Sequence, residues 1–139
     1  MNLWLTINYE RSRYLVNLER ISVFCQKNNG KVTFWLPESG IAINLNRYID
    51  LGAYHKVIHY IKNLPMDLDS SSWVKLTYER DQYVINLESI SSFCFSGNDR
   101  LTFWLPDSSI PIIISGRGDP EGYQKVINFL KQKTGQLPI

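Results

Sequence analysis

The chain has 139 residues, of which 44% are hydrophobic and 20% are charged, a composition that excludes a disordered chain. Its formal net charge of +2 at pH 7 is too small to imply a polyanionic partner by itself. Two cysteines are too few for a disulfide scaffold, and neither a signal-peptide pattern nor a membrane-length apolar run is present, so we predict a cytoplasmic protein.

The first predicted strand covers Leu3–Tyr9 and ends in a charged turn at Glu10–Arg13. Two more apolar segments follow, Tyr14–Leu18 and Ile21–Gln26, with a bend at Glu19–Arg20 between them. If the bend only kinks one strand, the unit has four strands and a helix. If the bend breaks the strand, the unit has five strands and a helix. The residues leave both alternatives open.

Two further strands and a helix follow in the chain. The Asn-Gly pair within Asn28–Lys31 is typical of a tight hairpin, and the strands at Val32–Pro37 and Ile41–Leu45 are expected to pair. Apolar residues then recur at helical spacing, which predicts a helix with one buried stripe and with Asp50 as its N-cap. The stripe consists of Tyr54, Val57, Ile58 and Ile61.

The whole pattern occurs twice. "WLTINYERSRYLVNLERISVFC" from Trp4 aligns without a gap with "WVKLTYERDQYVINLESISSFC" from Trp73, and "TFWLP" follows in both copies. About 27 positions are identical over residues 4–64, so the two halves are expected to share one local fold. We therefore assign residues 1–64 to a first repeat, 65–72 to a linker and 73–139 to a second repeat.

These elements predict an α+β fold. Each repeat is an antiparallel sheet of four or five strands followed by a C-terminal helix, in the second repeat with Asp119 as N-cap. A unit of this size buries little core alone. The two units are therefore expected to pack with pseudo-twofold symmetry into one compact domain.

Alternation along the strands separates an aliphatic face, expected under the helix, from a second face that carries tryptophans. This second face is interpreted either as a junction between the units or as a stacking platform for nucleic-acid bases. Cations nearby would then contact phosphates. The candidate residues are Trp4, Trp35, Trp73, Trp104, Lys31, Lys75, Arg11, Arg13 and Arg80. Charge is uneven as well, because residues 1–64 carry 8 basic and 4 acidic side chains, and residues 65–139 carry 7 and 9.

No motif for catalysis, cofactor binding or metal binding stands out, so an enzyme is not expected. Cys25 and Cys94 occupy matching positions and are predicted to be small buried hydrophobes. His55 and His59 lie four residues apart, a spacing that can share a metal, but no third ligand is evident.

If the bend at Glu19–Arg20 does not break its strand, the order of four strands and a helix, repeated once, resembles the Whirly- and PC4-like single-stranded DNA-binding architecture. The resemblance lies in element order over nearly the whole chain. It implies two units that pair with exchanged helices and sheets that bind nucleic acid.

We predict a non-enzymatic intracellular binding module, with a scaffolding or regulatory role, that binds proteins and can form a homodimer. The alternative is a protein that binds single-stranded nucleic acid through the tryptophan-bearing faces. No cofactor, metal or membrane partner is expected.

Overall fold

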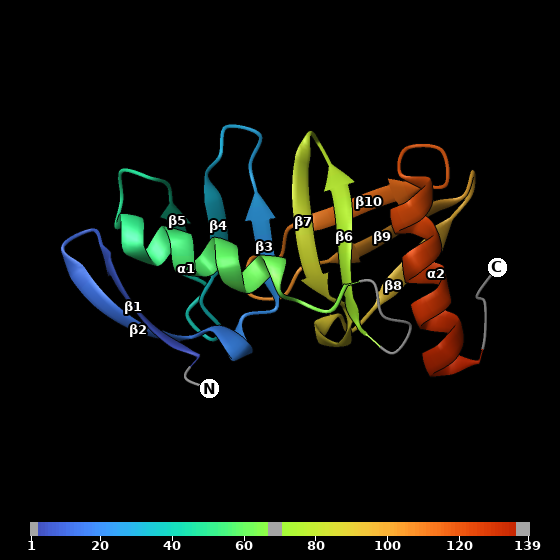
Figure 1. Cartoon of the computed structure of the whole chain (residues 1–139). Helices are drawn as coiled ribbons and strands as arrows, with labels where there is room; N and C mark the ends of the chain where they lie inside the picture. The colour runs from blue at the N-terminus through green and yellow to red at the C-terminus, as the bar shows by residue number, and fades with distance from the viewer. Residues whose placement is uncertain (1–2, 67–70, 136–139) are drawn as a thin grey trace.

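The computed structural model describes residues 3–66 and 71–135, so the middle of the predicted linker lies outside the described residues. The first repeat contains β1 (Trp4–Tyr9), β2 (Ser12–Asn17), β3 (Val23–Gln26), β4 (Val32–Trp35), β5 (Ala42–Leu45) and α1 (Leu51–Lys62). The second contains β6 (Trp73–Tyr78), β7 (Asp81–Asn86), β8 (Phe93–Ser96), β9 (Arg100–Trp104), β10 (Pro111–Ser115) and α2 (Pro120–Thr134). The predicted α+β fold with antiparallel sheets is confirmed (Figure 1).

The bend after β2 breaks the strand. A 3-10 helix, η1 (Leu18–Arg20), follows β2, and the Asn17 side chain accepts a hydrogen bond of 3.1 Å from the Glu19 N–H. Asn86 caps the matching helix η2 (Leu87–Ser89) of the second repeat in the same way. Each repeat therefore has five strands, and the four-strand order on which the resemblance to Whirly- and PC4-like proteins depended is wrong.

The central sheet is built from both repeats, in the order β5-β4-β3-β7-β6. The remaining strands form a two-stranded sheet, β1-β2, and a three-stranded sheet, β10-β9-β8. By the repeat, β3 corresponds to β8 and β7 corresponds to β2. A twofold relation would pair β2 with β8 as well as β3 with β7, but within the described residues β2 and β8 are both edge strands. The repeats are therefore joined by one strand pair, β3 with β7, and the symmetry-related pair of β2 with β8 is not formed among the described residues.

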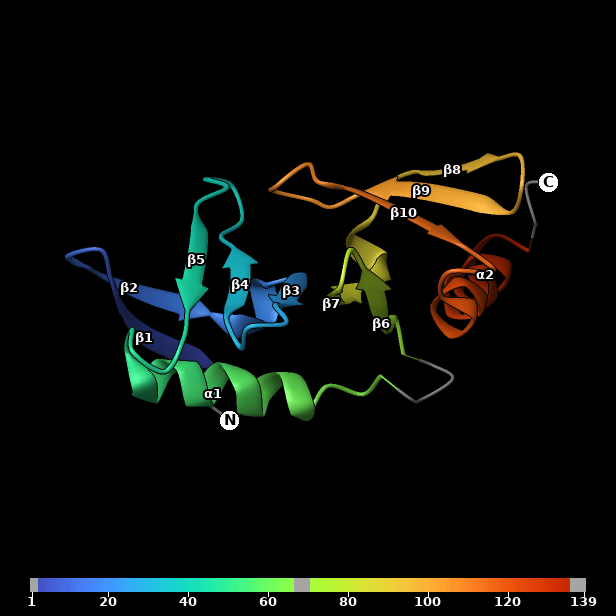
Figure 2. The same ribbon diagram turned by 90° about the horizontal axis from the view of Figure 1, so that it is seen from above.

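Each face of the central sheet covers a separate hydrophobic core. Phe24 and Val84 point into the first core, under α1 and beside β1. Cys25 and Ile85, their chain neighbours, point into the second core, which α2 and the three-stranded sheet enclose. Figure 2 shows α1 along one side of the strands of the first repeat and the three-stranded sheet beyond the other side. Both cores therefore contain side chains of both repeats, and neither is complete without the other half of the chain.

Both helices begin at the predicted aspartates. Asp50 accepts hydrogen bonds from the N–H of Ala53 at 3.2 Å and from the N–H of Asn8 at 2.9 Å. Asp119 accepts hydrogen bonds from the N–H of Gly122 at 3.1 Å and from the N–H of Thr77 at 2.9 Å. Each N-cap therefore also attaches its helix to the first strand of its repeat.

Replacing Asp50 with Ala is expected to lower the free energy of unfolding by about 1–2 kcal/mol, because the cap and the link to β1 are lost together. The Asn8 hydrogen bond, and then that of Ala53, lowers the pKa of the Asp50 carboxyl. Its contribution is therefore full above the unfolded-state pKa and is lost as pH falls through the folded-state pKa. Urea unfolding of wild type and Asp50→Asn should give a stability difference that is constant near neutral pH and changes only in acid. A difference that is the same at all pH values would contradict this assignment.

Candidate functional site

Four of the predicted site residues, two tryptophans and two cations, lie at opposite ends of the central sheet. Trp35 is at the end of β4 and Trp73 at the start of β6, and the strand registers place both at one end. Lys31 and Arg80 lie in the turns at the other end. A four-residue strand spans about 13 Å. The structure therefore does not bring these tryptophans together with these cations.

The tryptophans differ in burial. Trp35 is half-buried and packs against the second core, and Trp73 is half-buried and packs against the first. The Trp73 ring centroid lies 6.3 Å from that of Phe24. Trp4 and Trp104 are 58% and 46% exposed. Two of the four rings therefore lie at the junction between the repeats, and the other two face solvent.

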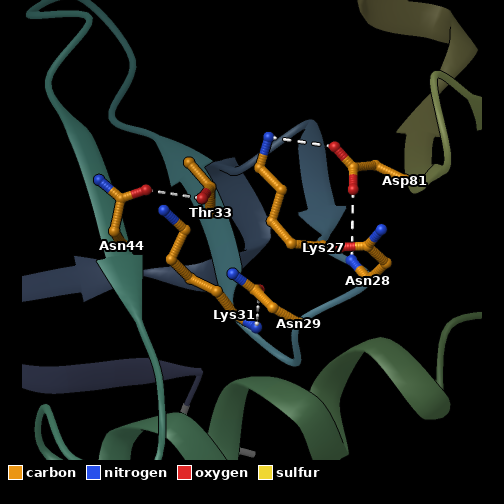
Figure 3. A network of polar contacts seen from close by, with 7 residues as sticks. All are labelled: Lys27, Asn28, Asn29, Lys31, Thr33, Asn44 and Asp81. Atoms are coloured by element: carbon orange, nitrogen blue, oxygen red, sulfur yellow. Dashed lines mark hydrogen bonds and ion pairs between the residues drawn. The ribbon is translucent and has the colours of Figure 1, made fainter.

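At the other end of the sheet, Asp81 connects the turns of the two repeats (Figure 3). Its carboxylate accepts a hydrogen bond of 3.2 Å from the Lys27 ammonium and another of 3.2 Å from the Asn28 N–H. Partial burial is the largest single effect and lowers the pKa of Lys27, but the hydrogen bond and charge of Asp81 together with the interaction with Cys25 outweigh it, and the net shift of this pKa is upward. Lys27 is therefore charged at neutral pH and already engaged within the protein.

Side-chain hydrogen bonds hold the β1–β2 hairpin beside the end of the central sheet where Asp81 lies. The Thr33 hydroxyl donates to Asn44 Oδ1 at 2.7 Å, and Asn44 Nδ2 donates to the Tyr9 hydroxyl at 3.2 Å. Tyr9 ends β1 and Asn44 lies near the end of β5, so the loops that follow these two strands are close neighbours. Figure 1 shows the β3–β4 and β6–β7 turns side by side at the top of the central sheet.

We call the β1–β2, β3–β4 and β6–β7 turns, together with the β5–α1 loop, the turn end. Its cations are Arg11, Lys31, Arg47 and Arg80 in these segments and Arg13 at the start of β2, directly after the first turn. Four are exposed, and Lys31 is partly buried. The ion pairs within residues 3–66 and 71–135 are Lys27–Asp81 and Lys133–Glu88, so none of the five takes part in one. Three carboxylates, Glu10, Asp50 and Glu79, lie in the same segments, and five cations against these three leave an excess of positive charge.

The cations of the turn end differ at two positions from the cations predicted from the sequence. Arg47, in the loop after β5, belongs to the turn end but is not among the residues predicted from the sequence. The excess of basic residues in the first repeat was the available signal for it. Lys75, which was selected, is exposed midway along β6, opposite Val84 in the register.

The surface beside Trp4 is hollowed and bears basic groups. A hollow of about 760 Å³ lies between β1 and α1, and Trp4, His55, Lys56, His59 and Tyr60 line it. Burial raises the pKa of the Tyr60 hydroxyl. In the part of the chain that the structure describes, no three His, Cys, Asp or Glu side chains gather as metal ligands.

The cysteines do not share one environment. Cys25 is completely buried, as predicted, and burial raises the pKa of its thiol. The prediction that Cys94 is buried is wrong, because it lies on the edge strand β8 and is exposed. The difference arises because β3 has a neighbour on both sides, whereas β8 has one only on the β9 side.

No protein-family model matches the sequence, and a search of curated proteins finds no match either. Neither described helix is long and apolar enough to cross a membrane. Among solved structures, the chain is similar to the LytTr DNA-binding domain of a methyl-accepting/DNA response regulator from Bacillus cereus. The two are 12% identical, the match covers 96% of this chain and 99% of that chain, and the TM-score is 0.50. At this identity the similarity is one of fold, and it extends over both repeats.

Proposed function

We propose that the chain binds DNA and that the turn end contacts the phosphate backbone. The observation that carries the proposal is the group of five cations on or directly beside neighbouring turns, none of which is used in an ion pair among the described residues. The similarity in fold to a LytTr DNA-binding domain supports it. The proposed role is binding, without a catalytic step.

The chemistry of the turn end suits phosphate groups. Arg11, Arg47 and Arg80 each offer a planar guanidinium that can donate two parallel hydrogen bonds to phosphate oxygens. Because the four arginines are exposed, they can reach a ligand without a rearrangement of the sheets. Contacts of this kind release counterions from DNA, so the affinity must fall as salt rises.

Fluorescence anisotropy with a labelled duplex and with one of its single strands tests the proposal. Arg80→Ala and Lys31→Ala should each weaken binding, and each should reduce the slope of log affinity against log salt by about 1. Lys131→Ala is the matched control, because Lys131 is an exposed cation on α2, away from the turn end. All three substitutions remove one positive charge.

Equal losses in all three variants would show that net charge alone is responsible and would refute the turn end as the site. Absence of binding to either oligonucleotide at low salt would refute DNA binding altogether. A duplex preference would favour contacts to the backbone of a helix. A single-strand preference would point to unstacked bases.

Base stacking on Trp4 is a second candidate, favoured by the hollow beside this ring with Lys56, His55 and His59. Stacking on an aromatic ring contributes about 1–3 kcal/mol per base. Trp4→Ala should therefore weaken binding of the single strand more than that of the duplex, and titration should quench the fluorescence of Trp4. Equal affinities of wild type and Trp4→Ala for the single strand would exclude this mode.

A further inference from the structure

The pairing of β3 with β7 shows how one unit of this chain docks on another. The register joins Phe24 with Val84 and Cys25 with Tyr83. The Asn86 N–H donates to the Ser22 carbonyl at 2.8 Å, and the Lys27–Asp81 ion pair closes the far end. This junction joins the third strand of one repeat to the second strand of the other.

Each strand of the junction has a counterpart in the other repeat, and each counterpart lacks a neighbour on one side. β8 is the third strand of the second repeat and β2 is the second strand of the first repeat, and each lies at the edge of its sheet. Figures 1 and 2 both place β2 and β8 toward opposite ends of the molecule. They therefore cannot pair within one chain without a rearrangement of the junction.

Each edge strand exposes one residue whose counterpart in the junction is completely buried. Val84 of β7 is completely buried, whereas Leu15, its counterpart on β2, is 68% exposed. Cys25 of β3 is completely buried, and Cys94 of β8 is exposed. β8 has no charged residue and no proline, the features that usually protect an edge from pairing.

The surface along β2 also has the shape of a junction. A hollow of about 410 Å³ follows this strand, and Tyr14, Val16, Ile21 and Leu36 are among the residues that line it. Their counterparts in the second repeat are Tyr83, Ile85, Ile90 and Leu105, which share the second core with Val23 and Cys25 of β3. The hollow therefore corresponds to the place that β3 fills in the second repeat.

We propose that β8 of one copy pairs with β2 of a second copy, antiparallel and in the register of β3 with β7. Phe93 then lies opposite Leu15, and Cys94 lies opposite Tyr14. The contact joins the second repeat, whose residues 73–139 carry 7 basic and 7 acidic side chains, to the first repeat, which carries 8 and 4. Because the second repeat has no net charge, no net repulsion between the two repeats opposes the contact. Such a contact is head-to-tail, and it continues into a chain of copies or closes into a ring.

One element of the intramolecular junction is missing between copies. The counterparts of Lys27 and Asp81 are Ser96 and Ser12, which cannot form an ion pair. The contact between copies is therefore expected to be weaker than the junction within one chain and to depend on protein concentration. The proposal can therefore be tested with a variant that strengthens association as well as with one that weakens it.

Sedimentation velocity of the full chain, up to about 1 mM, measures the assembly. Wild type should show a mass that rises with concentration beyond a dimer, or to a closed ring. Leu15→Lys should weaken association at least about tenfold, because it places an unpaired charge opposite Phe93. Since Leu15 is exposed, this variant should keep the circular dichroism spectrum and melting temperature of wild type. The exposed control Thr6→Lys, on β1, should associate as wild type does.

The double variant Ser12→Asp with Ser96→Lys recreates the missing ion pair and should associate more tightly than wild type. Ser12→Asp alone should not. A constant monomeric mass for both wild type and the double variant over the whole range would overturn the proposal. Association that Leu15→Lys leaves unchanged would also overturn it, because it would place the contact elsewhere.

Discussion

Phe24→Ala should lower the free energy of unfolding by about 3–5 kcal/mol, as expected for an aromatic ring removed from a packed core. Phe24 is completely buried. Its ring centroid lies 5.8 Å from that of Phe34 and 5.9 Å from that of Tyr60. With Trp73 also in contact, this one ring joins β4, α1 and the first strand of the second repeat. Urea or thermal unfolding measures the loss.

Phe93→Ala is the matched control for this prediction. Phe93 holds the position in the second repeat that Phe24 holds in the first, and its ring centroid lies 5.4 Å from that of Phe103. Unlike Phe24, it is partly exposed on an edge strand. Its removal should cost about 1–2 kcal/mol at protein concentrations where the chain is monomeric, since less apolar surface is lost. Equal losses for Phe24→Ala and Phe93→Ala would show that the junction between repeats adds nothing to stability.

Val84→Lys is expected to destabilise the protein by more than about 4 kcal/mol, because it buries an ammonium without a partner. Val84 is completely buried in the central sheet, between β6 and β3. Its neighbour in the register, Phe24, is also completely buried, so the ammonium would face an apolar ring in the core. The expected result is a chain that is unfolded or insoluble under conditions where wild type is folded.

Leu15→Lys makes the matching change in the first repeat and should alter the free energy of unfolding of the monomer by less than about 0.5 kcal/mol. Leu15 is 68% exposed, and the ammonium would remain in water. Soluble, folded Val84→Lys with wild-type stability would contradict the structure of the central sheet. A large loss in Leu15→Lys would show that β2 is not an edge strand.

The local elements of this protein could be predicted from short stretches of sequence. Strand alternation separated Leu5 and Ile7, which are buried, from Thr6 and Asn8, which are exposed. The helices and their caps at Asp50 and Asp119 follow from apolar spacing and from one side chain at each start. These features depend on interactions between residues close in the chain, so they can be recognised without knowledge of the fold.

The broken strand at Glu19–Arg20 could not be predicted from the local sequence. Whether the bend kinks or breaks a strand depends on the Asn17 cap and on which strand pairs with each side. β2 pairs with β1, whereas β3 pairs with β4 and β7, so the two segments enter different sheets. The partner that takes β3 into the central sheet, β7, lies far away in the sequence, and the local pattern at the bend is the same for either outcome.

The sequence by itself determined the repeat, its strands, its helices and the two faces of each strand, because these depend on periodicity and on neighbouring residues. Only the tertiary structure decided that β3 pairs with β7 while β2 and β8 stay at edges, since the repeats carry nearly the same signals. It also decided that Arg47 belongs to the turn end together with Arg11, Arg13, Lys31 and Arg80. The physical reason is that side chains such as Val84 and Leu15 are alike in chemistry, and their burial depends on which strand lies beside them.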